Sequence, residues 1–288
     1  MRRLPAERIP TLPPPVKAVA RHAVWKFGSA TAGARRLPTF LVIGAQKAGT
    51  TALYAYLRWH PAISGPAWKE VSFFDRHFWR GLRWYQGQFP LRTSRRLVAV
   101  GEASPSYLFH PLAPQRVAAL LPGVKLIAIL RDPVERAYSH YQHEVSLGRE
   151  PLSFEDALAA EEERIAGEVE RMSVNPRYFS RAWWDHTYAA RGLYAEQLER
   201  WFAVFPRRQL LVLTNDDLAE RTEEAYHRTL EFLGVQPWRP PQGFPRIFER
   251  AYAEPPAPAC AALAARFAEP NRALAELLGR ELPWGNVP

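Results

Sequence analysis

The sequence predicts an α/β protein with three layers, in which a central, mostly parallel sheet is flanked by helices. Short, continuously apolar runs at 39–43 and 124–130 are typical of strands that are covered on both faces. Segments with helical periodicity follow these runs, and this alternation favours strands joined by helical crossovers. A glycine-containing turn at 44–49 links the first run to the first helix, as in phosphate-binding βα units.

The predicted elements follow one another through most of the chain. The first strand ends at Gly44, and the helix after it covers 50–59. Later patterns predict, in order, strand 97–100, strand 124–130, helix 133–147, helix 154–171, helix 192–205, strand 210–213, helix 222–233 and helix 259–279. Gly148 is expected to stop the helix that begins at Pro133, because glycine readily takes the left-handed conformation that ends helices.

Composition limits the classes of protein that the chain can represent. It has 288 residues, of which 47% are hydrophobic, and this suits one folded domain with a substantial core. A single cysteine, Cys260, rules out an intrachain disulfide and a cysteine-rich zinc site. We find no apolar run of about 18 residues that would predict a membrane span, and no segment with the pattern of a secretory signal. We therefore expect a cytoplasmic protein.

Positive charge is concentrated at the start of the chain. Residues 1–39 contain eight lysines and arginines and one glutamate, and so carry +7 of the formal net charge of +9. We expect 1–38 to be a basic, proline-rich lead-in and 39–288 to be the folded domain. The lead-in could contact an anionic membrane through a basic amphipathic helix near 19–27, or pack on the domain as a solubilising leader. Because the folded body carries little excess charge, we do not expect nucleic acid as a partner.

The turn at 44–51 is the main candidate for a ligand site. Its sequence is Gly-Ala-Gln-Lys-Ala-Gly-Thr-Thr, with Lys47 inside the loop. Glycines let several backbone N–H groups point at one anion at a helix N-terminus, and the lysine and the threonine hydroxyls add donors. A nucleotide kinase or ATPase would place lysine directly after the second glycine, where Thr50 stands here. A tight connection between strand and helix, without a ligand, is the alternative interpretation.

Further motifs follow this loop along the chain. They are His60-Pro61, Lys-Glu-Val-Ser-Phe-Phe-Asp at 69–75, Gly-Glu-Ala-Ser-Pro-Ser-Tyr at 101–107, Arg-Asp-Pro-Val-Glu-Arg-Ala-Tyr-Ser at 131–139, Glu-Pro-Asn-Arg at 269–272, and 278–284. Together with the loop, they resemble the sulfotransferases that use 3′-phosphoadenosine 5′-phosphosulfate (PAPS), and most closely the heparan sulfate type and its bacterial relatives. The resemblance covers about 38–150 and 191–284, and it implies a P-loop-like α/β fold.

The resemblance also implies how the 5′ end of the donor is held. Lys47 would reach the bridging oxygen between the sulfuryl group and the 5′-phosphate. An ammonium placed there stabilises the negative charge that grows on the departing phosphate. The backbone amides and hydroxyls that would hold the 5′-phosphosulfate are those of Ala48, Gly49, Thr50 and Thr51.

A second set of residues is implied for the 3′-phosphate. Arg131 would bind it through a charge-assisted fork, and Ser139, two turns into the following helix, through its hydroxyl. A purely structural salt bridge is the alternative role for Arg131. In the C-terminal part, the family has a Lys-Gly-Arg loop that contacts the nucleotide, and Arg250 falls on its arginine.

Glu70 stands where heparan sulfate 3-O-sulfotransferases carry their proposed general base. A carboxylate at this place could take the proton of the acceptor during attack. A surface ion pair with the preceding lysine is the alternative role. His77 is a weaker candidate for the base.

The acceptor is less well defined than the donor. The family has a histidine where Ser72 stands and a lysine where Ala103 stands, and both departures affect contacts to a heparan-like chain. The aromatic side chains of Trp79, Trp84 and Tyr85 could stack on a sugar ring or belong to the core. A sugar, a glycolipid, a polyketide and a small phenol therefore all remain open as acceptors, and the resemblance favours a carbohydrate. The choice between a hydroxyl and an amine is open as well.

We thus predict a PAPS-dependent sulfotransferase without a metal cofactor. Two alternatives make different predictions. A P-loop kinase or NTPase would bind ATP with Mg²⁺, whereas a basic surface-binding protein that keeps the fold without turnover would be insensitive to substitution of Lys47.

Overall fold

The computed structural model describes residues 25–93, 96–247 and 253–284. Its centre is a sheet in which every paired strand is parallel, in the order β2-β3-β1-β4-β5. The strands are β1 (Phe40–Gly44), β2 (Ile63–Ser64), β3 (Ala99–Ala103), β4 (Lys125–Leu130) and β5 (Leu210–Thr214). Because β1 lies between β3 and β4, the loops that leave these strands meet at the same edge of the sheet.

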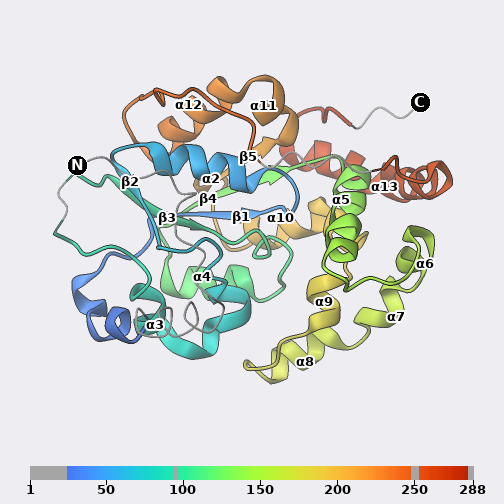
Figure 1. Cartoon of the computed structure of the whole chain (residues 1–288), viewed down its shortest axis with the longest axis horizontal. Helices are drawn as coiled ribbons and strands as arrows, with labels where there is room; N and C mark the ends of the chain where they lie inside the picture. Colours follow the sequence, from blue (N-terminus) through green and yellow to red (C-terminus); the bar gives the residue numbers. More distant parts are fainter. Residues whose placement is uncertain (1–24, 94–95, 248–252, 285–288) are drawn as a thin grey trace.

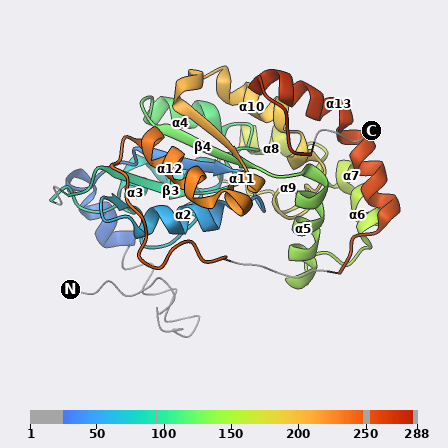
Figure 2. The same cartoon turned by 90° about the horizontal axis from the view of Figure 1, so that it is seen from above.

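Helices cover both faces of this sheet (Figures 1 and 2). One face carries α2 (Thr50–Trp59) and α12 (Thr222–Leu233), and α4 (Ala113–Leu120) and α10 (Tyr194–Phe202) lie on the other. The remaining layer elements are α3 (Gly81–Gln86), α11 (Asn215–Glu220) and α13 (Ala257–Leu278). The predicted three-layer α/β fold is confirmed.

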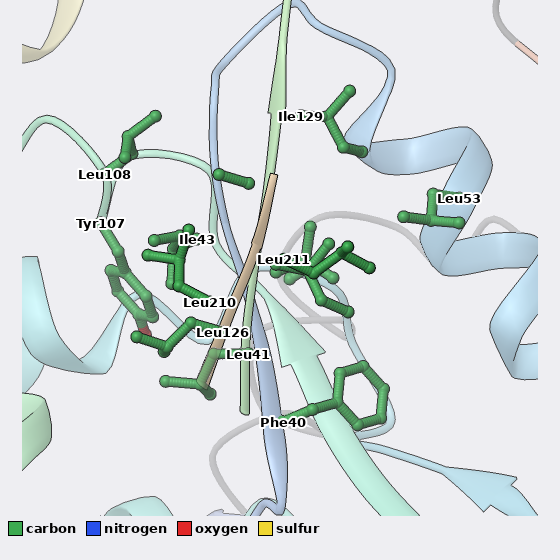
Figure 3. Close-up of a cluster of buried hydrophobic side chains, with 14 of the residues drawn as sticks. Phe40, Leu41, Ile43, Leu53, Tyr107, Leu108, Leu126, Ile129, Leu210 and Leu211 are labelled. Atoms are coloured by element: carbon green, nitrogen blue, oxygen red, sulfur yellow. The ribbon is translucent and has the colours of Figure 1, made fainter. Parts of the chain in front are cut away.

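The core forms where the strand side chains meet these helices. All five residues of β1 are buried, as are all five of β5. Figure 3 shows part of this cluster, in which side chains of β1, β4 and β5 pack with neighbours from α2 and from the loop after β3. Strands that are apolar on both faces are typical of parallel sheets covered on both sides, as the sequence predicted.

One predicted strand is displaced along the chain. We expected a strand at 97–100, but β3 runs from Ala99 to Ala103, and the side chain of Val98 is 55% exposed. A β-carbon at Gly101 would lie 2.5 Å from the ring of Phe40, so glycine is required where β3 passes β1. The polar and glycine residues at 101–102 hid this part of the strand from an apolar pattern.

A helical lobe lies beyond the end of β4, at the right of Figure 1. Its helices are α5 (Pro133–Ser146), α6 (Phe154–Ala159), α7 (Glu161–Ile165), α8 (Glu168–Val174) and α9 (Arg181–Asp185). The single helix predicted for 154–171 is wrong. The side chain of Glu161 turns inward and accepts hydrogen bonds from the amides of Ala189 (2.7 Å) and Ala190 (2.8 Å). Gly167, with φ 72°, then separates α7 from α8.

The segment before the sheet packs against α3. Residues 25–30 are helical, and Trp25 meets Trp84 edge-on with 5.6 Å between ring centroids. Arg35 donates a 2.6 Å hydrogen bond to the carbonyl of Phe89. Most of the helix expected near 19–27 lies outside the described residues. Within the described ranges, none of the helices is long and apolar enough to cross a membrane.

Candidate active site

The loop between β1 and α2 has the backbone of an anion site. A β-carbon at Gly44 would lie 2.5 Å from the β-carbon of Leu108, so the chain can leave β1 here only with glycine. Gly49 takes φ 95° at the start of α2, whose N-terminus, as far as the described residues show, receives no side-chain cap. The first N–H groups of a helix have no carbonyl one turn earlier to accept them. This helix N-terminus is therefore suited to a bound anion.

Two side chains from neighbouring strand ends hold the loop. Arg131, directly after β4, donates from Nη1 to the carbonyl of Lys47 over 3.3 Å. Asn215, directly after β5, donates from Nδ2 to the carbonyl of Ala48 over 3.3 Å. The C=O of Ala48 and the N–H of Gly49 belong to the same peptide, and in a trans peptide these two groups point in opposite directions. Because Asn215 binds the C=O, the N–H of Gly49 points away from Asn215.

Arg131 and Ser139 line one cavity of about 690 Å³ between α5 and α13. Ser139 is buried on α5, and the segment from Ala253 to Pro255 closes the cavity on another side. Arg250, which was predicted to contact the nucleotide, lies outside the described residues.

The positive charge at this cavity comes from Arg131 rather than from the start of α5. Asp132 caps α5, and its Oδ1 accepts from the amides of Val134 (2.8 Å) and Glu135 (3.0 Å). Arg131 also pairs with Glu135 through Nε (3.0 Å) and Nη2 (2.8 Å). The structural salt bridge considered for Arg131 thus exists, but the side chain of Glu135 is 62% exposed, and exposed pairs contribute little stability.

Glu70 lies beside the start of α2, where Lys69 connects it to the loop. The Nζ of Lys69 donates to the hydroxyl of Thr51 and lies 3.5 Å from Oε1 of Glu70. Burial lowers the pKa of Lys69, Glu70 raises it, and the nearby charge of Lys47 lowers it further. Lys69 was not predicted as a site residue, although its position next to Glu70 in the Lys-Glu motif was a usable signal.

Backbone strain gathers at the same place. Within the described ranges, the non-glycine residues with positive φ are Lys47 (71°), Glu70 (62°) and Ser72 (49°). Left-handed conformations cost such residues about 1–2 kcal/mol each, and they persist where the surrounding structure holds them. Two of these three are the residues predicted to be catalytic.

The other predicted candidates separate into core and surface. Trp84 and Tyr85 are buried in the core, and His77 packs edge-on against Trp84 at 5.3 Å. Trp79 is 42% exposed, with the guanidinium groups of Arg80 and Arg177 4.5 and 5.3 Å from its ring centroid. Of these three aromatics, only Trp79 presents its ring to solvent.

The two residues that depart from the family pattern, Ser72 and Ala103, are both buried. Neither residue therefore takes the place of the family's histidine or lysine at an exposed surface. Asp75 lies nearby and accepts a hydrogen bond from the hydroxyl of Ser106. Burial and the charge of Glu70 raise the pKa of the Asp75 carboxyl, and the hydrogen bond from Ser106 lowers it, with a net pKa of about 6.

The structure thus brings most of the predicted site residues together. Ser139 shares a cavity with Arg131, Arg131 contacts the Lys47 loop, and Thr51 at the end of that loop contacts Lys69 beside Glu70. The roles assigned to these residues stay predictions. Among the described residues, no three histidine, cysteine, aspartate or glutamate side chains gather as a metal-binding group.

Comparisons with known proteins identify the family. The model of the sulfotransferase domain matches residues 37–251. The bifunctional heparan sulfate N-deacetylase/N-sulfotransferase 3 of Homo sapiens is 39% identical over 210 residues, which are 70% of this chain and 23% of that protein. The bifunctional heparan sulfate N-deacetylase/N-sulfotransferase of Drosophila melanogaster is 32% identical over 255 residues, 81% of this chain and 23% of its own.

A solved structure agrees with these matches. The crystal structure of a sulfotransferase from Alicyclobacillus acidocaldarius has a TM-score of 0.69 and 32% identity, and the match covers 87% of this chain and 100% of that one. The chain spans about a quarter of the length of the curated relatives named above. The matched domain covers most of the chain and contains the Lys47 loop, Arg131 and Ser139, and the chain belongs to the sulfotransferase domain family.

Proposed function

We propose that this chain transfers a sulfuryl group from PAPS to a hydroxyl or amine of a carbohydrate. The observation that carries the proposal is the contact between Arg131 and the Lys47 loop, beside the cavity that Arg131 shares with Ser139. PAPS carries two anionic groups on the ribose of its adenosine, a 5′-phosphosulfate and a 3′-phosphate. Two neighbouring anion sites suit such a molecule.

The residues present fit this donor, which supplies a sulfuryl group attached to a phosphate leaving group. The uncapped start of α2 offers N–H groups of Gly49, Thr50 and Thr51 to the 5′ end. Lys47 places an ammonium in the same loop. This ammonium would stabilise the negative charge on the leaving phosphate more strongly in the transition state than in the ground state. Arg131 and Ser139 would hold the 3′-phosphate.

Glu70 is the proposed general base. Its side chain is 47% exposed and therefore accessible to an acceptor, while Lys69 keeps it next to the loop. A carboxylate so placed can accept the proton that the acceptor hydroxyl or amine loses, and such proton transfer contributes about 10²–10⁴-fold to rates.

A carbohydrate acceptor is supported by the relatives, which are named as heparan sulfate N-sulfotransferases. The partly exposed ring of Trp79 and the two guanidinium groups that lie over it form a surface that could contact a sugar ring. Ser72 and Ala103 are buried, so acceptor contacts must come from other side chains.

Two measurements test the proposal. In calorimetric titrations, 3′,5′-adenosine bisphosphate (PAP) should bind without Mg²⁺ and more tightly than ATP with Mg²⁺. The reverse order would favour a P-loop kinase. In transfer assays with ³⁵S-labelled PAPS, a heparan-type saccharide with free amines is compared with its N-acetylated counterpart. Label on the first alone indicates an amine acceptor, and label on both indicates a hydroxyl. PAP binding with no transfer to any saccharide would favour a protein that keeps the fold without turnover.

A further inference from the structure

We propose that Glu102 is a positioning residue for Glu70, on which it acts through the hydroxyl groups of Ser104 and Tyr107. This inference rests on the proposed function of Glu70 as the base. It adds a role for a side chain that lies beneath the site and touches neither donor nor acceptor.

The segment that carries Glu70 needs anchors outside itself. Glu70 and Ser72 are both left-handed, and no strand or helix includes residues 70–72. Two hydrogen bonds to the loop after β3 hold the end of this turn. The amide of Ser72 donates to Oγ of Ser104 over 3.0 Å, and the amide of Phe73 donates to the hydroxyl of Tyr107 over 2.8 Å.

Both of these hydroxyls donate their own protons to Glu102. Oγ of Ser104 lies 2.7 Å from Oε2, and the Tyr107 hydroxyl lies 2.9 Å from Oε1. A hydroxyl has only one proton, so each group that donates to Glu102 has only lone pairs left for an amide. Glu102 thereby keeps the protons of both hydroxyls turned away from the two amides, so that hydroxyl lone pairs face the N–H groups that hold the turn.

A carboxylate performs this task better than an amide. An ionised carboxylate only accepts, whereas glutamine would direct an N–H at one hydroxyl and turn that hydroxyl's proton elsewhere. The choice is costly, because Glu102 is fully buried. Burial and the charge of Asp75 raise its pKa, three hydroxyl donors lower it, and the net result is a pKa of about 7. A residue that destabilises the fold is expected where it serves the active site.

Tyr85 provides a matched control. Its hydroxyl donates to the same Oε1 of Glu102 over 2.7 Å, and its ring stacks on Phe73 at 4.3 Å between centroids. None of the hydrogen bonds described for the Glu70 turn goes to its hydroxyl. Tyr85→Phe therefore removes an equally short bond to Glu102 without removing an anchor.

The experiment compares Ser104→Ala, Tyr107→Phe and Glu102→Gln with Tyr85→Phe in the full chain. We expect kcat to fall at least tenfold in the first three, with PAP affinity within about twofold of wild type, and kcat in Tyr85→Phe to change by less than twofold. Melting temperatures report loss of stability separately. Equal losses of kcat in Tyr85→Phe and Tyr107→Phe would overturn the proposal, and so would unchanged kcat in Ser104→Ala and Tyr107→Phe.

A second readout does not depend on activity. Hydrogen exchange of the amides of Ser72 and Phe73 should be slow in wild type and Tyr85→Phe, and at least tenfold faster in Ser104→Ala for the first amide and Tyr107→Phe for the second. Unchanged exchange would refute the anchoring itself. Absence of sulfuryl transfer by wild type would instead refute the proposed function. Unchanged kcat in Glu70→Gln would refute the proposed role of Glu70 as general base. The role of Glu102 in positioning Glu70 would then be refuted as well.

Discussion

The side chain of Arg131 reaches back to the carbonyl oxygen of Lys47, 84 residues earlier in the chain and 3.3 Å away. The two residues meet because β1 and β4 are parallel neighbours whose following loops lie at the same edge of the sheet. The same guanidinium faces the cavity that contains Ser139. One side chain therefore touches both proposed anion sites.

Replacing Arg131 should weaken nucleotide binding. Arg131→Ala removes a charge-assisted hydrogen bond to the 3′-phosphate, a contact that contributes about 1.5–3 kcal/mol. We expect the Kd for PAP to rise about ten- to hundredfold in calorimetric titrations. The effect on adenosine 5′-phosphate, which lacks the 3′-phosphate, should be much smaller.

Glu135 separates this role from a structural salt bridge. If Arg131 serves the nucleotide, Glu135→Gln frees its Nε and Nη2 from a competing carboxylate, and PAP should bind as tightly as in wild type or more tightly. If the ion pair between Arg131 and Glu135 serves only to hold α5, Arg131→Ala and Glu135→Gln should lower the melting temperature by similar amounts and leave PAP affinity unchanged.

Lys47→Ala should impair transfer more than binding. The ammonium is proposed to act on charge that develops on the leaving phosphate, so its removal affects the transition state most. We expect kcat to fall at least about tenfold, or 1.4 kcal/mol, and the loss of PAP affinity to be smaller. Lys125→Ala, on β4, is a suitable control. A kcat equal to that of wild type in Lys47→Ala would contradict the proposed role.

The sequence predicted the donor side of the site well because each motif there is local. The strand, turn and helix of 40–59 occupy consecutive residues, and the helix bounds at Thr50 and Trp59 were predicted to the residue. The positions of Arg131 and Ser139 relative to each other could likewise be predicted from their spacing, because β4 leads directly into α5, which begins at Pro133.

The acceptor side could not be predicted in the same way because its contacts join distant residues. Lys69 finds Thr51 18 positions away, and the amide of Ser72 finds Ser104 32 positions away. Glu102 and two of its partners, Ser104 and Tyr107, lie within the motif at 101–107. Its link to Glu70 was still missed, because the amides that these two hydroxyls bind lie 32 and 34 positions earlier in the chain. Contacts between distant residues also explain why the single helix predicted for 154–171 was wrong. Glu161 accepts hydrogen bonds from amides 28 and 29 positions later in the chain.

The basic lead-in predicts binding to anionic membranes. If residues 1–38 contact lipid, the full chain should sediment with vesicles that contain anionic phosphatidylserine, and less so as salt is raised. A chain that begins at Trp25 should lose most of this binding and keep its PAP affinity. Equal sedimentation of both chains, or none of either, would contradict membrane contact by this segment.

Glu102 should make stability depend on pH in a defined direction. Its pKa in the folded chain is about 7, above its ordinary value of 4.5, so the folded state binds this proton more tightly than the unfolded state. The free energy of unfolding therefore contains a contribution that is present below about pH 4.5 and is lost as pH rises to about 7. Asp75 also has a raised pKa in the folded chain, so it also makes the free energy of unfolding fall as pH rises. This effect is present both in wild type and in Glu102→Gln, and it largely cancels when the two are compared.

In Glu102→Gln this contribution is absent. We expect the unfolding free energy of the variant, relative to wild type, to rise between pH 5 and pH 8 by on the order of 1–3 kcal/mol. Urea denaturation at pH 5, 6.5 and 8 measures the difference directly. The variant would then gain relative stability at the pH where it loses activity, because the ionised carboxylate destabilises the fold while it orients the hydroxyls that hold Glu70. A difference that stays constant with pH would show that Glu102 has the same protonation behaviour in the folded and unfolded chains, and the cost assigned to its burial would be wrong.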